Sequence, residues 1–175
     1  MNPAKAPFRA TFFPSAEMRV ERRADGTLVV EPVAELAPFT PSLPAQLSEW
    51  SARDPDRPCI AERAGKGGPW VEYSFEQFKH AADAVTQWLL DQRLPAGRSL
   101  LILSGNSIAH AVVKFGGMAA GVPVCPVSAN YSLMPGDFGR LRHVVKLVKP
   151  AVVFGEQTSL YKRALETVEF GDAIV

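Results

Sequence analysis

Cysteine is scarce in this 175-residue chain, and the two that occur, Cys59 and Cys125, are too few for a fold built on disulfides. Both lie in apolar runs, so we expect reduced core thiols in a cytoplasmic protein. An excess of one charge is also lacking, because 19 Lys and Arg residues face 18 Asp and Glu residues, a net charge of +1. That balance argues against nucleic-acid or membrane-surface partners bound through a general basic field.

Long hydrophobic runs are missing as well. No stretch approaches the roughly 20 apolar residues that span a bilayer, and prolines interrupt the first fifteen residues, so neither a membrane span nor a targeting signal is expected. The three histidines, His80, His110 and His143, fall in separate predicted helices without metal-ligand spacing, so no metal site is expected. The glycine patterns of dinucleotide-binding and phosphate-binding loops are absent from the sequence.

Proline is concentrated at the start of the chain, where nine of the fifteen prolines precede residue 59. This predicts a loop-rich lead-in over residues 1–44. Within it, Asp25-Gly26 between apolar runs predicts a β-hairpin with a type I′ turn. A short helix at 44–53 and a second hairpin, 59–62 with 70–73, should follow. We interpret the glycines at 65, 67 and 68 as the flexible tip of that hairpin.

The remaining chain alternates helices and apolar strands. Ser74 and Gln77 form a capping box at the start of the predicted helix 75–90. The other expected helices are 107–120, 137–148 and 157–167, and the expected strands are 99–103, 122–127, 151–154 and the beginning of a fourth at 173–175. A loop containing Asn130 and Pro135 should follow the second of these strands. Strands that are apolar along their whole length are typical of a parallel sheet covered on both faces. The fold class is therefore α/β, with a doubly wound, mostly parallel sheet, flanking helices and an antiparallel hairpin lead-in.

Direct evidence for chemistry is sparse, and no catalytic residue is assigned. Gly105 lies between a predicted strand and helix, where doubly wound folds bind ligands, although the pattern favours a compact turn capped by Ser107. Lys162 and Arg163 are interpreted either as solvated helix charges or as a basic pair that reaches a ligand phosphate. Cys125 paired with a distant histidine would be a nucleophile, but its position in a strand favours a structural thiol.

The order and spacing of several motifs resemble the opening of the adenylate-forming acyl-CoA synthetases, most closely the feruloyl-CoA synthases. The resemblance covers residues 39–154. The motifs are a helix with Trp50, Asp54-Pro55-Asp56-Arg57-Pro58, Ala61-Glu62-Arg63, Trp70, Tyr73-Ser74, Ser104-Gly105-Asn106-Ser107, Gly121-Val122-Pro123-Val124, Tyr131-Ser132-Leu133 and Leu141-Arg142-His143.

This resemblance implies an ATP-dependent ligase that adenylates an aryl or acyl acid and passes the acyl group to coenzyme A, with Mg and ATP as cofactors of the parent enzyme. The family's phosphate loop and catalytic lysine have no counterpart here. We therefore expect 45–175 to be the first part of a large N-terminal domain, truncated at its C-terminal end and inactive alone. We also expect the segment to self-associate through residues 151–154 or 173–175. The alternatives are a stand-alone, non-catalytic module that binds a ligand or partner, and a small enzyme using Cys125.

Overall fold

The computed structural model describes residues 17–134 and 136–175. The first fifteen residues, where no targeting signal is expected, and Pro135 of the predicted loop lie outside the described residues. The chain divides into two compact units, Met1–Phe39 and Thr40–Val175.

The first unit contains the predicted hairpin, formed by β1 (Met18–Arg22) and β2 (Leu28–Pro32), which pair antiparallel. Its turn differs from the predicted type I′. Of the turn residues, only Gly26 has a positive φ, at 88°, and its N–H donates to the carbonyl of Arg23. This is a type I turn followed by a left-handed glycine, the usual three-residue hairpin loop. The Asp25 carboxylate accepts from the Thr27 N–H at 2.9 Å.

The second unit opens with α1 (Leu43–Arg53), β3 (Pro58–Arg63), β4 (Trp70–Ser74) and α2 (Phe75–Asp91). The predicted capping box of α2 is confirmed, because Ser74 and Gln77 each bond the other's backbone N–H. The strands β3 and β4 pair antiparallel, with glycines at the tip as expected. Leu47 of α1 and Phe78 of α2 anchor a core cluster against which Tyr73 packs.

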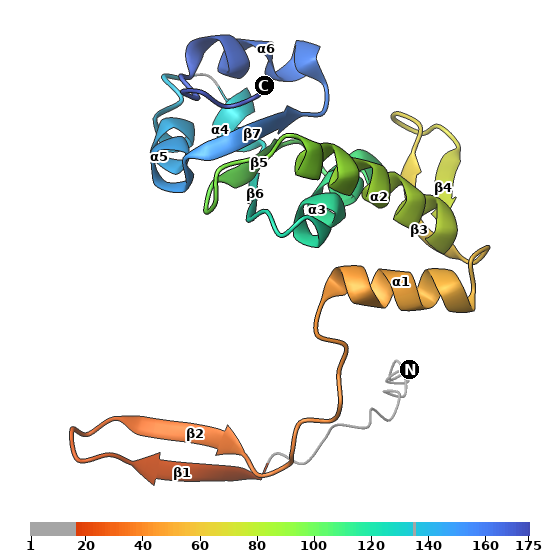
Figure 1. The fold of residues 1–175 in the computed structure, drawn as a ribbon. Helices are drawn as coiled ribbons and strands as arrows, with labels where there is room; N and C mark the ends of the chain where they lie inside the picture. The colour runs from red at the N-terminus through yellow and green to blue at the C-terminus, as the bar shows by residue number, and fades with distance from the viewer. Residues whose placement is uncertain (1–16, 135) are drawn as a thin grey trace, which may run out of the picture. The chain divides into compact units, whose positions relative to one another are not determined.

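A parallel sheet forms the centre of the second unit (Figure 1). Its strands are β5 (Ser99–Leu103), β6 (Val124–Val127) and β7 (Pro150–Gly155), in the order β6-β5-β7. The connections are α3 (Ile108–Ala119) between β5 and β6, and α4 (Asn130–Leu133) with α5 (Gly139–Val148) between β6 and β7. After β7, α6 (Thr158–Thr167) leads to Ile174, which bridges Val152 in parallel, so the expected fourth strand begins beside β7.

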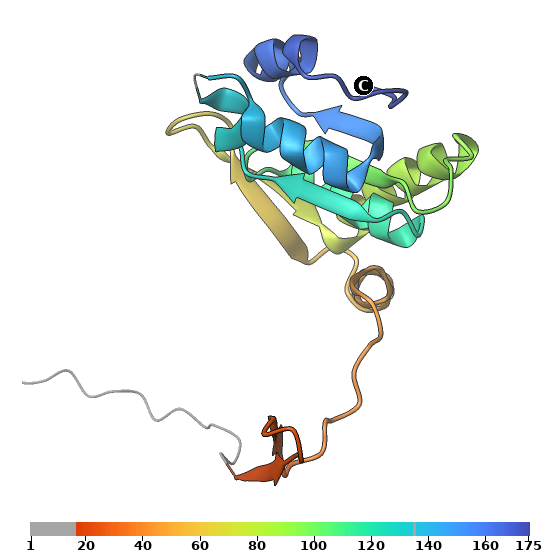
Figure 2. The same ribbon diagram turned by 90° about the vertical axis from the view of Figure 1, so that its left-hand side faces the viewer.

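Helices cover both faces of this sheet, as the sequence predicts. Leu100 and Ile102 of β5 pack toward α2 and α3, whereas Leu101 and Leu103 pack toward α5 and α6. Figure 2 shows α5 crossing in front of the sheet. The crossover from β5 to β6 and the crossover from β6 to β7 run across the sheet in opposite directions. Right-handed crossovers of opposite direction place their helices on opposite faces, which makes the fold doubly wound.

Two departures from the expected elements lie in the connection after β6. The predicted loop at Asn130 contains the short helix α4. The helix α5 begins at Gly139, two residues later than predicted, because Phe138 adopts the left-handed conformation (φ 58°) and cannot belong to the helix.

An arginine joins the amino-terminal ends of the sheet. Arg98, just before β5, donates to the carbonyl of Lys149 at 2.6 Å and to the carboxylate of Asp172 at 2.7 Å. The bonds lower the pKa of Asp172 and raise that of Arg98. The side chain therefore connects the turn before β7 with the turn before Ile174.

Two glycines let α3 pack closely on its neighbours. A Cβ added at Gly116 would lie 2.6 Å from the Val85 Cβ of α2, and one at Gly117 would lie 2.6 Å from Val124 Cγ2 of β6. Real Cβ atoms do not approach so closely, so helix–helix and helix–sheet packing depend on these two positions.

We predict that Gly116→Ala lowers the free energy of unfolding by about 1–2 kcal/mol, because overpacking exceeds the gain of roughly 1 kcal/mol in helix propensity. Urea denaturation followed by circular dichroism measures this change. Gly105→Ala is the matched control, because a Cβ there meets nothing within 4 Å. A Gly116 variant as stable as that control would contradict the packing argument.

Candidate functional site

The carboxyl ends of β5, β6 and β7 meet at one edge of the sheet, because the strands are parallel. The chain winds from β5 to β6 on one side and then crosses to β7 on the other. Doubly wound proteins bind ligands outside this edge, at the point where the winding direction changes. The loops that form the edge are residues 104–107, 128–134 with 136–138, and 156–157, and they define the candidate site.

The loop after β5 contains Gly105, the first candidate from the sequence. Its helix, α3, is capped by Ser107, whose hydroxyl accepts from the His110 N–H at 3.0 Å. The carboxylate of Glu62 on β3 accepts from the Ile108 N–H at 2.7 Å. Helix N-termini attract anions, and here a carboxylate of the chain itself takes that position. The Glu62 carboxylate therefore occupies the anion position at the N-terminus of α3. Gly105 is an exposed turn residue beside it.

A second hydrogen bond links this loop to α3. Ser104 Oγ and His110 Nδ1 lie 2.6 Å apart, and the Ser104 side chain is buried. No sequence pattern singles out this pair, because the bond joins the first residue of the loop to the first turn of the helix.

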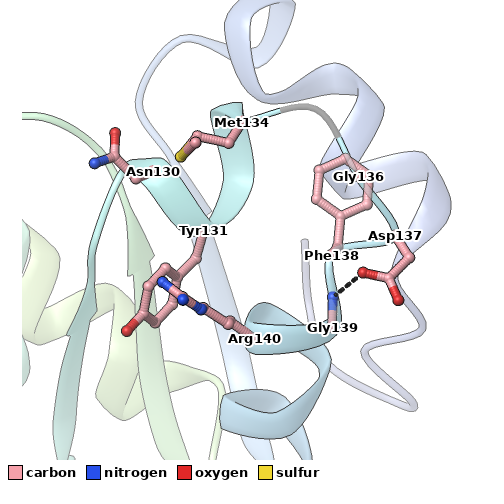
Figure 3. Close-up of a pocket in the computed structure, with 8 residues that line it drawn as sticks. All are labelled: Asn130, Tyr131, Met134, Gly136, Asp137, Phe138, Gly139 and Arg140. Atoms are coloured by element: carbon pink, nitrogen blue, oxygen red, sulfur yellow. Dashed lines mark hydrogen bonds between the residues drawn. The ribbon is translucent and has the colours of Figure 1, made fainter.

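The loop after β6 forms a cavity of about 250 Å³ between α4 and α5 (Figure 3). The Arg140 guanidinium lies 5.6 Å from the centre of the Tyr131 ring, a cation–π contact. Asn130 of α4 and Met134, the residue that follows α4, line the other end of the cavity. The exposed Arg140 gives this cavity a positive group beside an aromatic wall, an arrangement suited to an anionic or planar ligand.

The far wall of this cavity is a strained turn. Phe138 is buried with a left-handed backbone, which is costly for a residue with a Cβ. Arg163 of α6 lies 5.2 Å over the Phe138 ring and donates to the Gly136 carbonyl at 3.1 Å. The Asp137 carboxylate accepts from the Gly139 N–H at 2.9 Å (Figure 3). These contacts hold the turn in its strained form.

The structure does not bring together the three candidates from the sequence, Gly105, Lys162 and Arg163. Arg163 supports the cavity wall from outside, and Lys162 is exposed and pairs with Glu166 at 3.7 Å. Gly105 lies in a different loop. Sequence reasoning missed Arg140 and Glu62 as site residues, although Tyr131 and Glu62 both belong to motifs of the resemblance.

Both cysteines are unpaired and half-buried. Burial raises the pKa of the Cys59 thiol and of the Cys125 thiol. Cys125 packs against the cluster that holds Leu101 and Val127, which favours a structural thiol. Within the described residues, no group of three or more His, Cys, Asp or Glu side chains is placed to hold a metal ion, and no helix is long and apolar enough to cross a bilayer.

A family comparison gives the class of this chain. The family model for AMP-binding enzymes matches residues 47–173, and the chain belongs to that family. Among curated proteins, none matches the sequence.

Solved structures share the fold. The fatty acid AMP ligase from Legionella pneumophila matches with a TM-score of 0.57 and 17% identity, over 64% of this chain and 19% of that one. VinN in complex with 3-methylaspartate matches with a TM-score of 0.60 and 18% identity, over 75% and 33%. CmiS6 matches with a TM-score of 0.55 and 25% identity, over 70% and 30%. The chain thus spans a fifth to a third of these proteins, and its α/β fold matches the N-terminal subdomains of adenylate-forming enzymes.

The family uses ATP and Mg, so the described residues can be tested for a fit to both. The helix N-terminus at the edge of the sheet, the natural place for a phosphate, is taken by Glu62. A magnesium site needs oxygen ligands gathered at one point, and the described residues contain no such acidic group. The described residues alone therefore do not form an ATP–Mg site.

We predict that Cys125 reacts slowly with a disulfide reagent in the native protein, at least about tenfold slower than after unfolding, because burial restricts access and keeps the thiolate scarce. The rate is measured at pH 8 on the Cys59→Ser variant, which leaves Cys125 as the single thiol. Equal rates before and after unfolding in guanidinium would show an exposed, reactive thiol instead.

Proposed function

We propose that this chain is the N-terminal segment of an ATP-dependent acid–CoA ligase and is inactive alone. In this proposal residues 1–44 are the lead-in and 45–175 are the first part of the large N-terminal domain. The parent enzyme joins a carboxylate to the α-phosphate of ATP, releasing pyrophosphate, and the coenzyme A thiol then displaces AMP to form a thioester. The two free thiols suit a reducing compartment, so we place the protein in the cytoplasm.

The family match over residues 47–173 is the observation that carries this proposal. The doubly wound sheet supports it, because three loops converge on one edge without a complete nucleotide site among the described residues. Adenylation transfers the α-phosphorus of ATP to the acid. It requires hydrogen-bond donors and a cation that neutralise the negative charge around this phosphorus. We propose that segments beyond this chain supply them.

The acid we propose is a hydroxycinnamate or a similar aryl acid. The support is the feruloyl-type motifs, Ser104 to Ser107 and Tyr131 to Leu133, which lie in the loops after β5 and β6 at the carboxyl edge of the sheet. Lys162 remains a candidate contact for a ligand phosphate, because its pairing with Glu166 is a weak surface interaction. Gly105 leaves open space beside the same edge, and Arg163 acts by holding the Phe138 turn.

We predict that the 175-residue chain gives ATP–pyrophosphate exchange at background with ferulate, cinnamate, benzoate and a fatty acid, because it lacks a complete phosphate site. The polypeptide encoded by the whole reading frame should exchange with at least one aryl acid and form its CoA thioester. Exchange by the short chain that survives repurification would overturn the inactive-segment proposal. A whole-frame product that adenylates none of these acids would overturn the aryl-ligase proposal.

We also propose that the chain self-associates. The sequence names two segments for this contact, residues 151–154 and residues 173–175. We propose the second, because Ile174 already bonds Ala151 and Val153 on that side of β7, so residues 173–175 present the outer edge there. Beside it, an apolar hollow of about 460 Å³ runs along α2 and β7, where Trp88 is 42% and Val175 66% exposed. Apolar surface next to a strand edge is typical of an interface.

We predict that light scattering over a dilution series shows a dimer that dissociates on dilution, and that Val175→Lys shifts it to monomer, because a charge on an edge strand opposes pairing. Leu147→Lys is the matched control, since Leu147 is equally exposed, at 67%, but lies on α5. A monomer at every concentration would contradict self-association, and equal effects of the two variants would contradict the proposed edge.

A further inference from the structure

A cavity of about 310 Å³ lies between β3 and the outer side of α3, beside the loop that follows β5. Its polar wall contains Glu62, Asn106, His110 and Lys114, and its apolar wall includes Ile60 and Phe115. The volume is at the lower end of the range for small-molecule sites, and a mainly apolar lining with a few converging polar groups is the usual composition.

Lys114 is the first group that points to a ligand. Within the described part of the chain it takes part in no hydrogen bond or ion pair, although it is half-buried and lines the cavity. It is one helical turn from His110, so both side chains lie on the same face of α3. Glu62, the carboxylate across the cavity, already accepts the Ile108 N–H at 2.7 Å.

His110 is the second group, and its tautomer follows from Ser104. Ser104 is 4% exposed, and His110 Nδ1, at 2.6 Å, is the only hydrogen-bond partner of its hydroxyl among the described residues. A buried hydroxyl needs an acceptor for its proton. We assign the acceptor role to Nδ1 on this ground, which leaves the N–H on Nε2. The ring then presents a donor and not an acceptor at its free nitrogen.

We propose that this cavity binds a small organic monocarboxylate between Lys114 Nζ and His110 Nε2–H, with the apolar body against Ile60 and Phe115. One ammonium and one imidazole N–H match the two oxygens of a carboxylate. The negative charge of Glu62 repels a phosphate dianion about twice as strongly as a carboxylate monoanion in the same space, which favours the monocarboxylate. The binding proposal stands on this geometry alone, so it does not depend on the proposed ligase function.

Benzoate is the probe, and the amide resonances of the native chain, followed by ¹H–¹⁵N NMR, are the readout. We expect saturable shifts at Lys114 and Phe115 with a millimolar dissociation constant, below about 20 mM. Benzamide, which has the same ring without the charge, should bind at least about tenfold more weakly, because it lacks the charge-assisted hydrogen bonds. The absence of saturable shifts on α3, or equal binding of benzamide, would overturn the proposal.

The variants separate this site from general attraction to positive charge. Lys114→Met and His110→Gln should each weaken benzoate binding, the lysine change by about tenfold or more. Lys79→Met is the control, because Lys79 is a half-buried lysine on α2 with its own ion pair to Asp83, and it should leave binding unchanged. Equal weakening by Lys114→Met and Lys79→Met would overturn the proposed site. ATP–pyrophosphate exchange by the 175-residue chain should stay at background whether or not benzoate binds. The carboxylate site and the ligase proposal are therefore tested independently.

Discussion

Strand β5 is the element on which the second unit of the chain depends, because it is buried on both faces and paired on both edges. Its five residues are all buried, with β6 on one side and β7 on the other. Leu100 and Ile102 need α2 and α3 to cover them, and Leu101 and Leu103 need α5 and α6. Removing either helix layer would expose an apolar face of the sheet to water, at roughly 25 cal/mol for each Å² of apolar surface.

The same arrangement gathers three loops at the carboxyl edge of the sheet. Side chains of the chain itself occupy some of the positions there that could bind a ligand. Glu62 takes the N-terminus of α3, and Arg163 holds the turn at Phe138. Both contacts stabilise the loops and reduce the number of free groups that meet a ligand. Among the described residues, Arg140 lines one cavity and Lys114 the other, and both side chains are cationic.

Much of the fold was predictable because its signals are local. Strand β5 was predicted with its observed bounds, and the capping box at Ser74 and Gln77 uses residues three apart. The candidate site was harder to predict. The carboxyl edge followed from the alternation of strands and helices, but Gly105, Lys162 and Arg163 did not come together there. Loop side chains take their places from contacts with distant segments, which periodicity does not describe.

The sequence by itself determined the order of helices and strands and the two-sided burial of the sheet, because both depend on residue types within a few positions. It also determined the family resemblance, which depends on the order and spacing of short motifs. Tertiary structure decided the contacts that join distant positions: Glu62 to Ile108 across 46 residues and Arg98 to Asp172 across 74. It also decided the turn at Phe138, where packing of a ring under Arg163 outweighs the local preference against a left-handed backbone. A hydrogen bond between residues far apart in the sequence forms only once the fold has brought their segments together, so no local sequence pattern encodes it.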